Sequence, residues 1–194
     1  LISINISNSV NTIWDGAFQK CGITSIQIPD NIVYVGNAAF NECYGLANPI
    51  YNTHVFAFMP RSYNGTYTIP DGIEMIAGYA FSGCSNLTSV EIPNSVVAIG
   101  DAAFTSCIGL TSIALPYGIT YIGYNVFNSC SNLSSVVIPN SVTSIGSQAF
   151  LACYALNSIE IPSSVTSIGD NAFGYCPSPN LIMNSLTPPT LGNN

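Results

Sequence analysis

The sequence contains very little charge. Only 6% of its 194 residues are charged, and two of them are basic, Lys20 and Arg61, against nine acidic residues. A nucleic-acid-binding protein needs clustered lysine and arginine side chains to displace counterions from phosphates, and two such residues cannot supply them. Anionic membrane surfaces are disfavoured for the same reason. We therefore expect no nucleic acid among the partners of this chain.

Long apolar runs are missing as well. The longest spans residues 55–59, whereas a membrane-crossing helix needs about 20 apolar residues. The chain also does not begin with the basic segment and apolar stretch of a signal peptide. We expect no membrane insertion by these residues, and we expect any export signal to lie outside them.

The sequence is rich in repetition instead. Cysteine recurs every 23 residues from Cys84 to Cys176, after Cys21 and Cys43, and a phenylalanine stands three residues before each cysteine. The common unit reads L-x-x-I-x-I-P-x-x-V-x-x-I-G-x-x-A-F-x-x-C. A period of this length is typical of a solenoid, in which each turn of the chain is one repeat.

One unit, residues 87–107, illustrates the expected coil. The alternation in "LTSVEIP" predicts a half-buried strand that ends at Pro93, because proline cannot donate to a strand ladder. "SVVAIG" predicts a second short strand, followed by Gly100, where a side chain would obstruct a bend or the φ angle must be positive. "DAAFTSC" is short enough to predict a single helical or 3-10 turn. We predict a mainly β repeat solenoid with parallel short strands and about seven coils of 23 residues.

The seven cysteines are expected to be buried packing residues. Residues stacked in successive coils stand about 4.8 Å apart with parallel side chains, whereas a disulfide needs converging Cβ atoms about 3.5–4.5 Å apart. Their number is odd, and the sequence has no C-x-x-C motif or nearby histidine to complete a metal site. We expect no metal ligands among them.

The period breaks between Cys43 and Cys84. Here "HVFAFM" and "TYTI" look like two strands joined by "PRSYNG", whose Asn64-Gly65 pair favours a hairpin turn. This irregular hairpin-like insertion, about residues 48–69, carries the only histidine, the only arginine and five aromatic residues: Tyr51, Phe56, Phe58, Tyr63 and Tyr67. Insertions in solenoids often map to a binding face, although a hairpin that buries Phe56 and Phe58 as additional core explains the same residues. Both interpretations hold together if the tyrosines and Arg61 stay outside.

Residues that could carry catalysis are scarce and scattered. The only histidine, His54, has no cysteine or serine partner with an activating neighbour. Glu91 and Glu160 share a repeat position but lie three coils apart, about 14 Å at about 4.8 Å per coil, too far to act on one glycosidic bond. The other acidic residues are interpreted as solvated surface charges, among them Asp15, Asp101 and Asp170. We expect no enzymatic activity, no catalytic residues and no cofactor.

The repeat resembles the BspA-type leucine-rich repeat over about residues 10–176. The most specific matches are "IPNSVTSIGSQAFLAC" (138–153) and "IPSSVTSIGDNAFGYC" (161–176), and the irregular segment 48–73 is similar to a variant unit of such proteins. The first unit departs from the pattern, with Ile13-Trp14 in place of Ile-Gly. The resemblance implies one leucine-rich repeat solenoid domain over 1–194, with a C-terminal extension at 177–194 in a chain that stops before a further unit.

The resemblance also implies an exported, cell-surface or secreted protein of a bacterial family linked to adhesion and host-protein binding. We favour a non-enzymatic module that binds a protein partner, such as an extracellular host protein, through the solenoid face and the aromatic insertion. A carbohydrate-binding module that holds glycan on exposed tyrosines and a passive spacer that displays another domain remain alternatives. The candidate binding residues are Tyr51, Arg61, Tyr63, Tyr67, Ser89, Glu91, Ser158 and Glu160.

Overall fold

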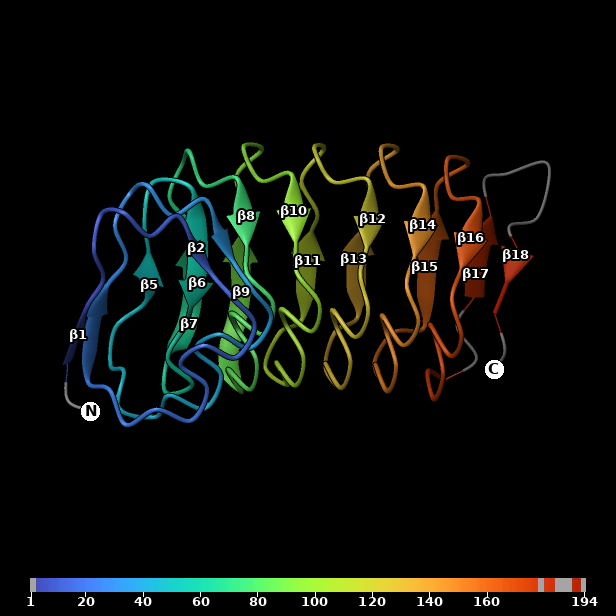
Figure 1. Cartoon of the computed structure of the whole chain (residues 1–194). Helices are drawn as coiled ribbons and strands as arrows, with labels where there is room; N and C mark the ends of the chain where they lie inside the picture. The colour runs from blue at the N-terminus through green and yellow to red at the C-terminus, as the bar shows by residue number, and fades with distance from the viewer. Residues whose placement is uncertain (1–2, 178–179, 184–189, 193–194) are drawn as a thin grey trace.

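The chain folds into a stack of similar turns of β-structure, which runs from the N-terminus at the left of Figure 1 to the C-terminus at the right. The structure is a computed structural model that describes residues 3–177, 180–183 and 190–192. Its strands are β1 (Ser3–Asn5), β2 (Thr12–Ile13), β3 (Ser25–Gln27), β4 (Tyr34–Val35), β5 (Ile50–Tyr51), β6 (Val55–Phe58), β7 (Asn64–Thr68), β8 (Met75–Ile76), β9 (Asn86–Glu91), β10 (Ala98–Ile99), β11 (Ser112–Ala114), β12 (Tyr121–Ile122), β13 (Ser135–Val137), β14 (Ser144–Ile145), β15 (Ser158–Ile161), β16 (Ser167–Ile168), β17 (Asn180–Met183) and β18 (Thr190–Leu191).

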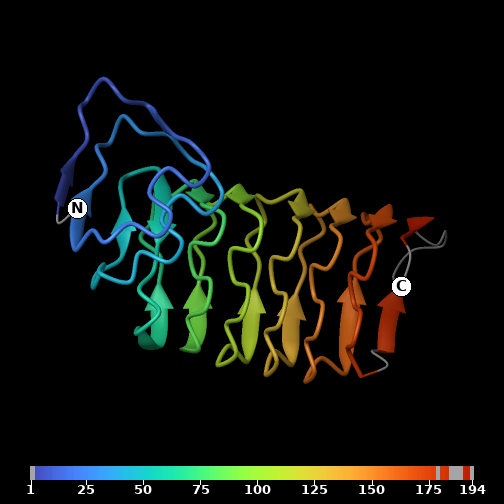
Figure 2. The same cartoon turned by 60° about the horizontal axis from the view of Figure 1, so that its bottom comes forward.

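Each turn contributes one strand to each of two faces of the solenoid. The odd-numbered strands form what we call the first face and the even-numbered strands the second face, and both appear as rows of arrows in Figure 2. Strands of successive turns pair in parallel, as where Ser112 of β11 stands opposite Ser135 of β13, although the pairing is interrupted between some turns, such as β9 and β11. The predicted β solenoid is therefore confirmed. Strands β1 to β16 make eight turns in the described part of the chain rather than about seven, because the irregular segment forms a turn of its own.

The segment that ends each repeat is a pair of tight turns, and no helix forms in the described residues. The expected helical or 3-10 turn is wrong because two residues four positions apart have positive φ, for example Ala102 at 53° and Ser106 at 58°. Left-handed residues interrupt a right-handed helix. Their amide groups point along the solenoid and donate to the next turn, to the carbonyls of Tyr124 at 2.9 Å and Asn128 at 2.8 Å.

The predicted phenylalanine column runs through the core. Phe81, Phe104 and Phe127 are fully buried and stacked, with ring centroids 4.9 and 5.5 Å apart and planes within 15°. The column continues at both ends of this group. It comprises the stack of Phe56, Phe81, Phe104, Phe127, Phe150 and Phe173, and a separate pair, Phe18 and Phe40. Each turn therefore buries its ring against its neighbours, as a repeat that cannot form a core alone must do.

The repeat glycine is explained by close approach between turns. A Cβ atom on Gly100 would lie 2.4 Å from the backbone nitrogen of Gly78, and one on Gly146 would lie 2.8 Å from the carbonyl carbon of Gly123. None of these glycines has a positive φ. We expected this glycine either because a side chain would obstruct the bend or because φ must be positive. The structure confirms the first explanation.

The irregular segment forms a complete turn, and the expected hairpin between residues 54–59 and 66–69 is wrong. Strand β6 pairs antiparallel with β5 and parallel with β8, so it belongs to the second face, whereas β7 pairs in parallel with β9 on the first face. Asn64-Gly65 lies inside β7, where the register shifts at a bulge and Gly65 has a φ of 98°. A glycine with positive φ suits such a bulge as well as it suits a turn.

The expected C-terminal extension at 177–194 is partly described. Strand β17 pairs in parallel with β15, and β18 pairs with β16, so both faces continue beyond the last Phe-x-x-Cys unit. The rest of that extension, residues 178–179, 184–189 and 193–194, lies outside the described residues.

Candidate functional site

The three tyrosines of the irregular segment gather around Phe56. The Tyr51 ring stacks on Phe56 at 5.9 Å, the Tyr67 ring meets it at 5.6 Å, and Tyr63 contacts Tyr67 edge-on at 5.4 Å. Tyr51 is exposed, whereas Tyr63 and Tyr67 are half-buried. Burial, with Tyr51 and Tyr63 nearby, raises the pKa of Tyr67 to about 12. Tyr67 is therefore neutral at physiological pH, and its ring also packs against Phe81.

Arg61 joins the turns on either side of the irregular segment. Its Nε donates to the Ser82 carbonyl, its Nη1 to the Tyr44 hydroxyl and its Nη2 to Asn41 Oδ1, each at 3.1 Å. The guanidinium also lies 5.1 Å from the centroid of the Tyr44 ring. All three nitrogens thus have partners within the chain. Arg61 bridges the position where the irregular turn lacks a Phe-x-x-Cys segment.

The four candidates outside the irregular segment lie on the first face. Ser89 stands opposite Thr66, and Glu91 stands opposite Thr68, whose hydroxyl donates to Glu91 Oε2 at 2.8 Å. Ser158 and Glu160 continue the same two rows on β15. Glu91, Ser158 and Glu160 are exposed, Ser89 is half-buried, and Glu160 also lines a small pocket beside Val137 and Pro162.

The cysteines are free thiols, and the five from Cys43 to Cys153 are buried. Their sulfurs do more than fill space, because most donate to a phenylalanine carbonyl of the preceding turn, as Cys107 does to Phe81 at 3.0 Å. Burial raises the pKa of Cys84 and of Cys130 to about 12. A protonated, buried thiol is a poor nucleophile. Across residues 3–177, 180–183 and 190–192, no group of three or more metal-ligating side chains forms.

Two of the acidic residues interpreted as surface charges have a role between turns. The Asp15 carboxylate accepts the Asn37 amide at 2.8 Å, and the Asp101 carboxylate accepts the Tyr124 amide at 2.9 Å. His54, the only histidine, stands 3.6 Å from the Glu74 carboxylate. These side chains therefore contact neighbouring parts of the solenoid and help to hold its turns together.

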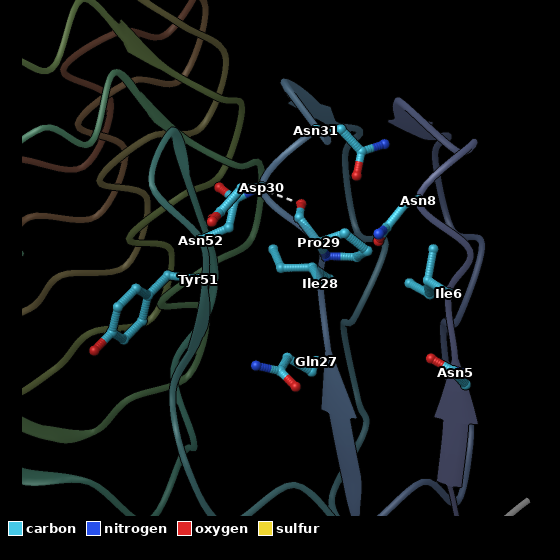
Figure 3. A pocket seen from close by; sticks show the side chains of 10 residues that line it. All are labelled: Asn5, Ile6, Asn8, Gln27, Ile28, Pro29, Asp30, Asn31, Tyr51 and Asn52. Carbon is cyan, nitrogen blue, oxygen red and sulfur yellow. Dashed lines mark hydrogen bonds between the residues drawn. The ribbon is translucent and has the colours of Figure 1, made fainter.

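A polar pocket of about 630 Å³ lies where the first three turns meet on the first face. Figure 3 shows its side chains arriving from three neighbouring segments of chain. The lining residues are Asn5, Ile6, Asn8, Gln27, Ile28, Pro29, Asp30, Asn31, Tyr51 and Asn52. Of the candidate residues, only Tyr51 lines this pocket, and its ring extends away from the other side chains (Figure 3). We call it the amide pocket.

Asn52 fixes one wall of the amide pocket. Its Nδ2 donates to the carbonyls of Pro29 at 2.8 Å and Ile32 at 2.7 Å, while its Oδ1 accepts the amides of His54 at 2.9 Å and Val55 at 2.7 Å. Asn52 is polar but buried, with only 8% of the residue exposed. Sequence reasoning missed Asn52, because its bonds depend on how the irregular turn lies against the preceding one.

An exposed aromatic pair was also missed. The rings of Trp14 and Tyr34 lie 6.2 Å apart on adjacent turns of the second face, and 71% of Trp14 is exposed. Val10 and Val33, on the same two turns, are exposed too. We call these four residues the Trp14 patch. Its one sequence signal is that Trp14 stands where later repeats have glycine.

Comparison with protein families identifies the repeat. The family model "BspA type Leucine rich repeat region" matches in six copies over residues 1–65 and 52–180. No curated protein matches the chain. No helix in the described residues is long and apolar enough to cross a membrane.

Solved structures share the fold. A leucine-rich cell surface protein from Faecalibacterium prausnitzii is 29% identical, with a TM-score of 0.72 over 97% of this chain. A leucine-rich repeat protein from T. pallidum is 25% identical, with a TM-score of 0.57 over 98% of this chain and 73% of its own. The pneumococcal vaccine antigen PcpA is 18% identical, with a TM-score of 0.54 over 93% of this chain and 61% of its own, and supports the fold alone. The chain spans 60% of the length of the Faecalibacterium protein.

Proposed function

The chain belongs to the BspA-type leucine-rich repeat family, and on that premise we propose that it is a non-enzymatic cell-surface or secreted module that binds an extracellular protein. The similarity to a bacterial cell surface protein supports the location. The general use of solenoids as extended binding surfaces supports the activity.

The observation that carries this proposal is the exposure of the Trp14 patch. Tryptophan and tyrosine are enriched among residues that dominate protein–protein binding energy, and large exposed apolar groups that cluster mark interaction sites. Here Trp14 is 71% exposed beside Tyr34, with Val10 and Val33 on the same turns.

Two further regions can extend the contact. The polar rows of the first face, which include half-buried Ser89 and exposed Glu91, Ser158 and Glu160, offer hydrogen-bonding groups with few charges to desolvate. Tyr51 and Tyr63 offer aromatic edges at the irregular turn. Arg61 supports that region from within through its three hydrogen bonds.

Binding to immobilised extracellular proteins tests the function. A panel of fibronectin, collagen, laminin and mucin is exposed to the chain, and we expect saturable binding to at least one. Trp14→Ala should weaken that binding about 30-fold, the effect of losing a hot-spot residue worth about 2 kcal/mol.

Tyr154→Ala is the matched control, because Tyr154 is 62% exposed on a distant turn; it should bind as the parent does. If Tyr51→Ala loses binding while Trp14→Ala binds as the parent does, the binding site lies at the irregular turn and not at the Trp14 patch. A chain that binds no protein in the panel would contradict the function.

A further inference from the structure

We propose that the amide pocket is a binding site for a neutral saccharide, distinct from the Trp14 patch that we propose as the centre of protein binding. The pocket is about 630 Å³, within the range of about 300–1,000 Å³ typical of small-molecule sites. It lies where the first face is interrupted, since β5 pairs with β6 and not with β3.

The hydrogen-bonding groups of the pocket suit a polyhydroxylated ligand. Among the residues that the structure describes, no hydrogen bond involves the side chains of Asn5, Asn8 or Gln27. Each amide offers both donors and an acceptor, which is what adjacent hydroxyl groups require. Asp30 adds an acceptor. Its Oδ1 accepts a hydrogen bond from the Thr53 amide at 3.1 Å, and its second carboxylate oxygen can accept one from a ligand.

The charge of the pocket selects against anionic ligands. None of its lining residues is basic, and Asp30 contributes a negative charge. The two basic side chains of the chain are engaged elsewhere, Lys20 beside Glu42 at 3.9 Å and Arg61 in its three hydrogen bonds. A phosphate, sulfate or uronic acid would meet repulsion without compensation, so the ligand is a neutral sugar.

The floor of the pocket is apolar, as the carbon-bound hydrogens of a pyranose ring require. Ile28 is buried, and Ile6 and Pro29 are half-buried. In Figure 3, Ile28 and Pro29 lie between the amide of Gln27 and that of Asn31. A sugar ring can thus rest its apolar face on this floor while its hydroxyl groups reach the amides.

The scaffold around the pocket is held in place before a ligand arrives. Asn52 makes four hydrogen bonds across the second and third turns, and Asn31 donates to the Val10 carbonyl of the first. Prior ordering lowers the entropic cost of binding.

Titration of ¹⁵N-labelled protein with sugars tests the site. The probes are lactose, cellobiose and N-acetyllactosamine as neutral ligands, with 3′-sialyllactose and galactose 6-sulfate as anionic ones. We expect at least one neutral disaccharide to shift the side-chain amide resonances of Asn5, Asn8 and Gln27 and to saturate in the millimolar range. The anionic probes should bind at least tenfold more weakly.

Gln27→Ala removes an exposed amide and should weaken saccharide binding at least tenfold. Asn94→Ala removes an exposed amide from a regular turn and should leave it unchanged, as should Trp14→Ala. Saccharide binding that persists in Gln27→Ala, equal binding of sialyllactose, or no shift with any neutral disaccharide would overturn the proposal. None of these results depends on whether the chain binds a protein.

Discussion

The Nε atom of Arg61 donates a 3.1 Å hydrogen bond to the carbonyl of Ser82, directly before Gly83. Gly83 has a φ of 75°, and a Cβ atom there would stand 3.0 Å from the same Nε. Other turns place Ser106 or Ser129 at this left-handed position. Gly83 therefore gives the guanidinium room to cross from the irregular turn to the next one.

Loss of Arg61 should destabilise the chain. We expect Arg61→Ala to lower the free energy of unfolding by about 2–3 kcal/mol, because hydrogen bonds from a charged donor are lost and two carbonyl-type acceptors lose a partner. Gly83→Ala should lower the free energy of unfolding by about 1–2 kcal/mol, because alanine is strained in a left-handed conformation and because its Cβ atom would contact Arg61. Urea denaturation of both variants and the double variant measures this.

The double variant should be less destabilised than the sum of the single ones, since the clash disappears with the arginine. Lys20→Ala is the control: its ion pair is 3.9 Å long and its side chain is 68% exposed, so stability should change little. Strict additivity would show that Gly83 does not accommodate Arg61.

Gly100→Ala tests the close approach of turns. The added Cβ would meet backbone atoms of Gly78 at 2.4 and 2.7 Å, which cannot move without shifting a whole turn. We expect the free energy of unfolding to fall by about 1–3 kcal/mol, measured by thermal or urea unfolding. Gly22→Ala is the matched control, because nothing lies within 4 Å of its Cβ position. Equal stability of the two variants would contradict the packing explanation.

Stability should fall in alkaline solution because of the buried thiols. Below a pH of about 9, the ordinary pKa given for a cysteine thiol, these groups are protonated in both states and the native state keeps its full stability. Above it, the unfolded chain loses protons that the folded chain retains, since burial raises the pKa of Cys84 and of Cys130 to about 12. Each thiol then contributes a decline of up to about 1.4 kcal/mol per pH unit.

Urea midpoints at pH 7, 9 and 10.5 measure this decline. Cys130→Ala should lower stability at pH 7, through lost packing and the lost 3.1 Å bond to the Phe104 carbonyl, yet reduce the slope above pH 9. Burial also raises the pKa of Tyr67, from its ordinary value of 10 to about 12, so Tyr67→Phe separates the contribution of this tyrosine above pH 10. A slope unchanged by the cysteine substitution would exclude the thiols as its source.

Asn52 should be essential to the irregular turn. Asn52→Ala loses four hydrogen bonds in a buried place, and we expect a loss of about 3 kcal/mol. Asn52→Asp should be worse at neutral pH, since a carboxylate oxygen would face the carbonyls of Pro29 and Ile32. Urea denaturation measures both, with exposed Asn48→Ala as the control. Wild-type protection of the Val55 amide from hydrogen exchange in Asn52→Ala would contradict this role.

The stacked architecture could be predicted from the sequence because the regular 23-residue spacing of the repeats is sufficient to determine it. A 23-residue period places Phe104 over Phe81 whatever the details of each turn, and the stacked rings confirm this. The left-handed turns could not be predicted in the same way. Ala38 and Ala102 adopt positive φ although alanine has no local preference for it, since bonds to the adjacent turn determine their conformation.

The irregular turn shows why local signals were insufficient. Asn64-Gly65 favours a hairpin, but the repeat resumes at Ile69-Pro70 and fixes β7 against β9, so the ladder determines the conformation. The amide pocket depends on three turns that the sequence does not position relative to one another. Trp14 was visible as a departure from the repeat, whereas its exposure and its partner Tyr34 required coordinates.

The interruption in the phenylalanine stack has a mechanical consequence. No ring contact joins Phe40 to Phe56 in the described residues, and Figure 2 shows the first two turns rising away from the straight remainder. A pulling force along the long axis of the solenoid would therefore be resisted least at this junction, which Asn52 and Arg61 cross with hydrogen bonds. Stretching the molecule should detach its first two turns as a unit and leave a still-folded rod behind.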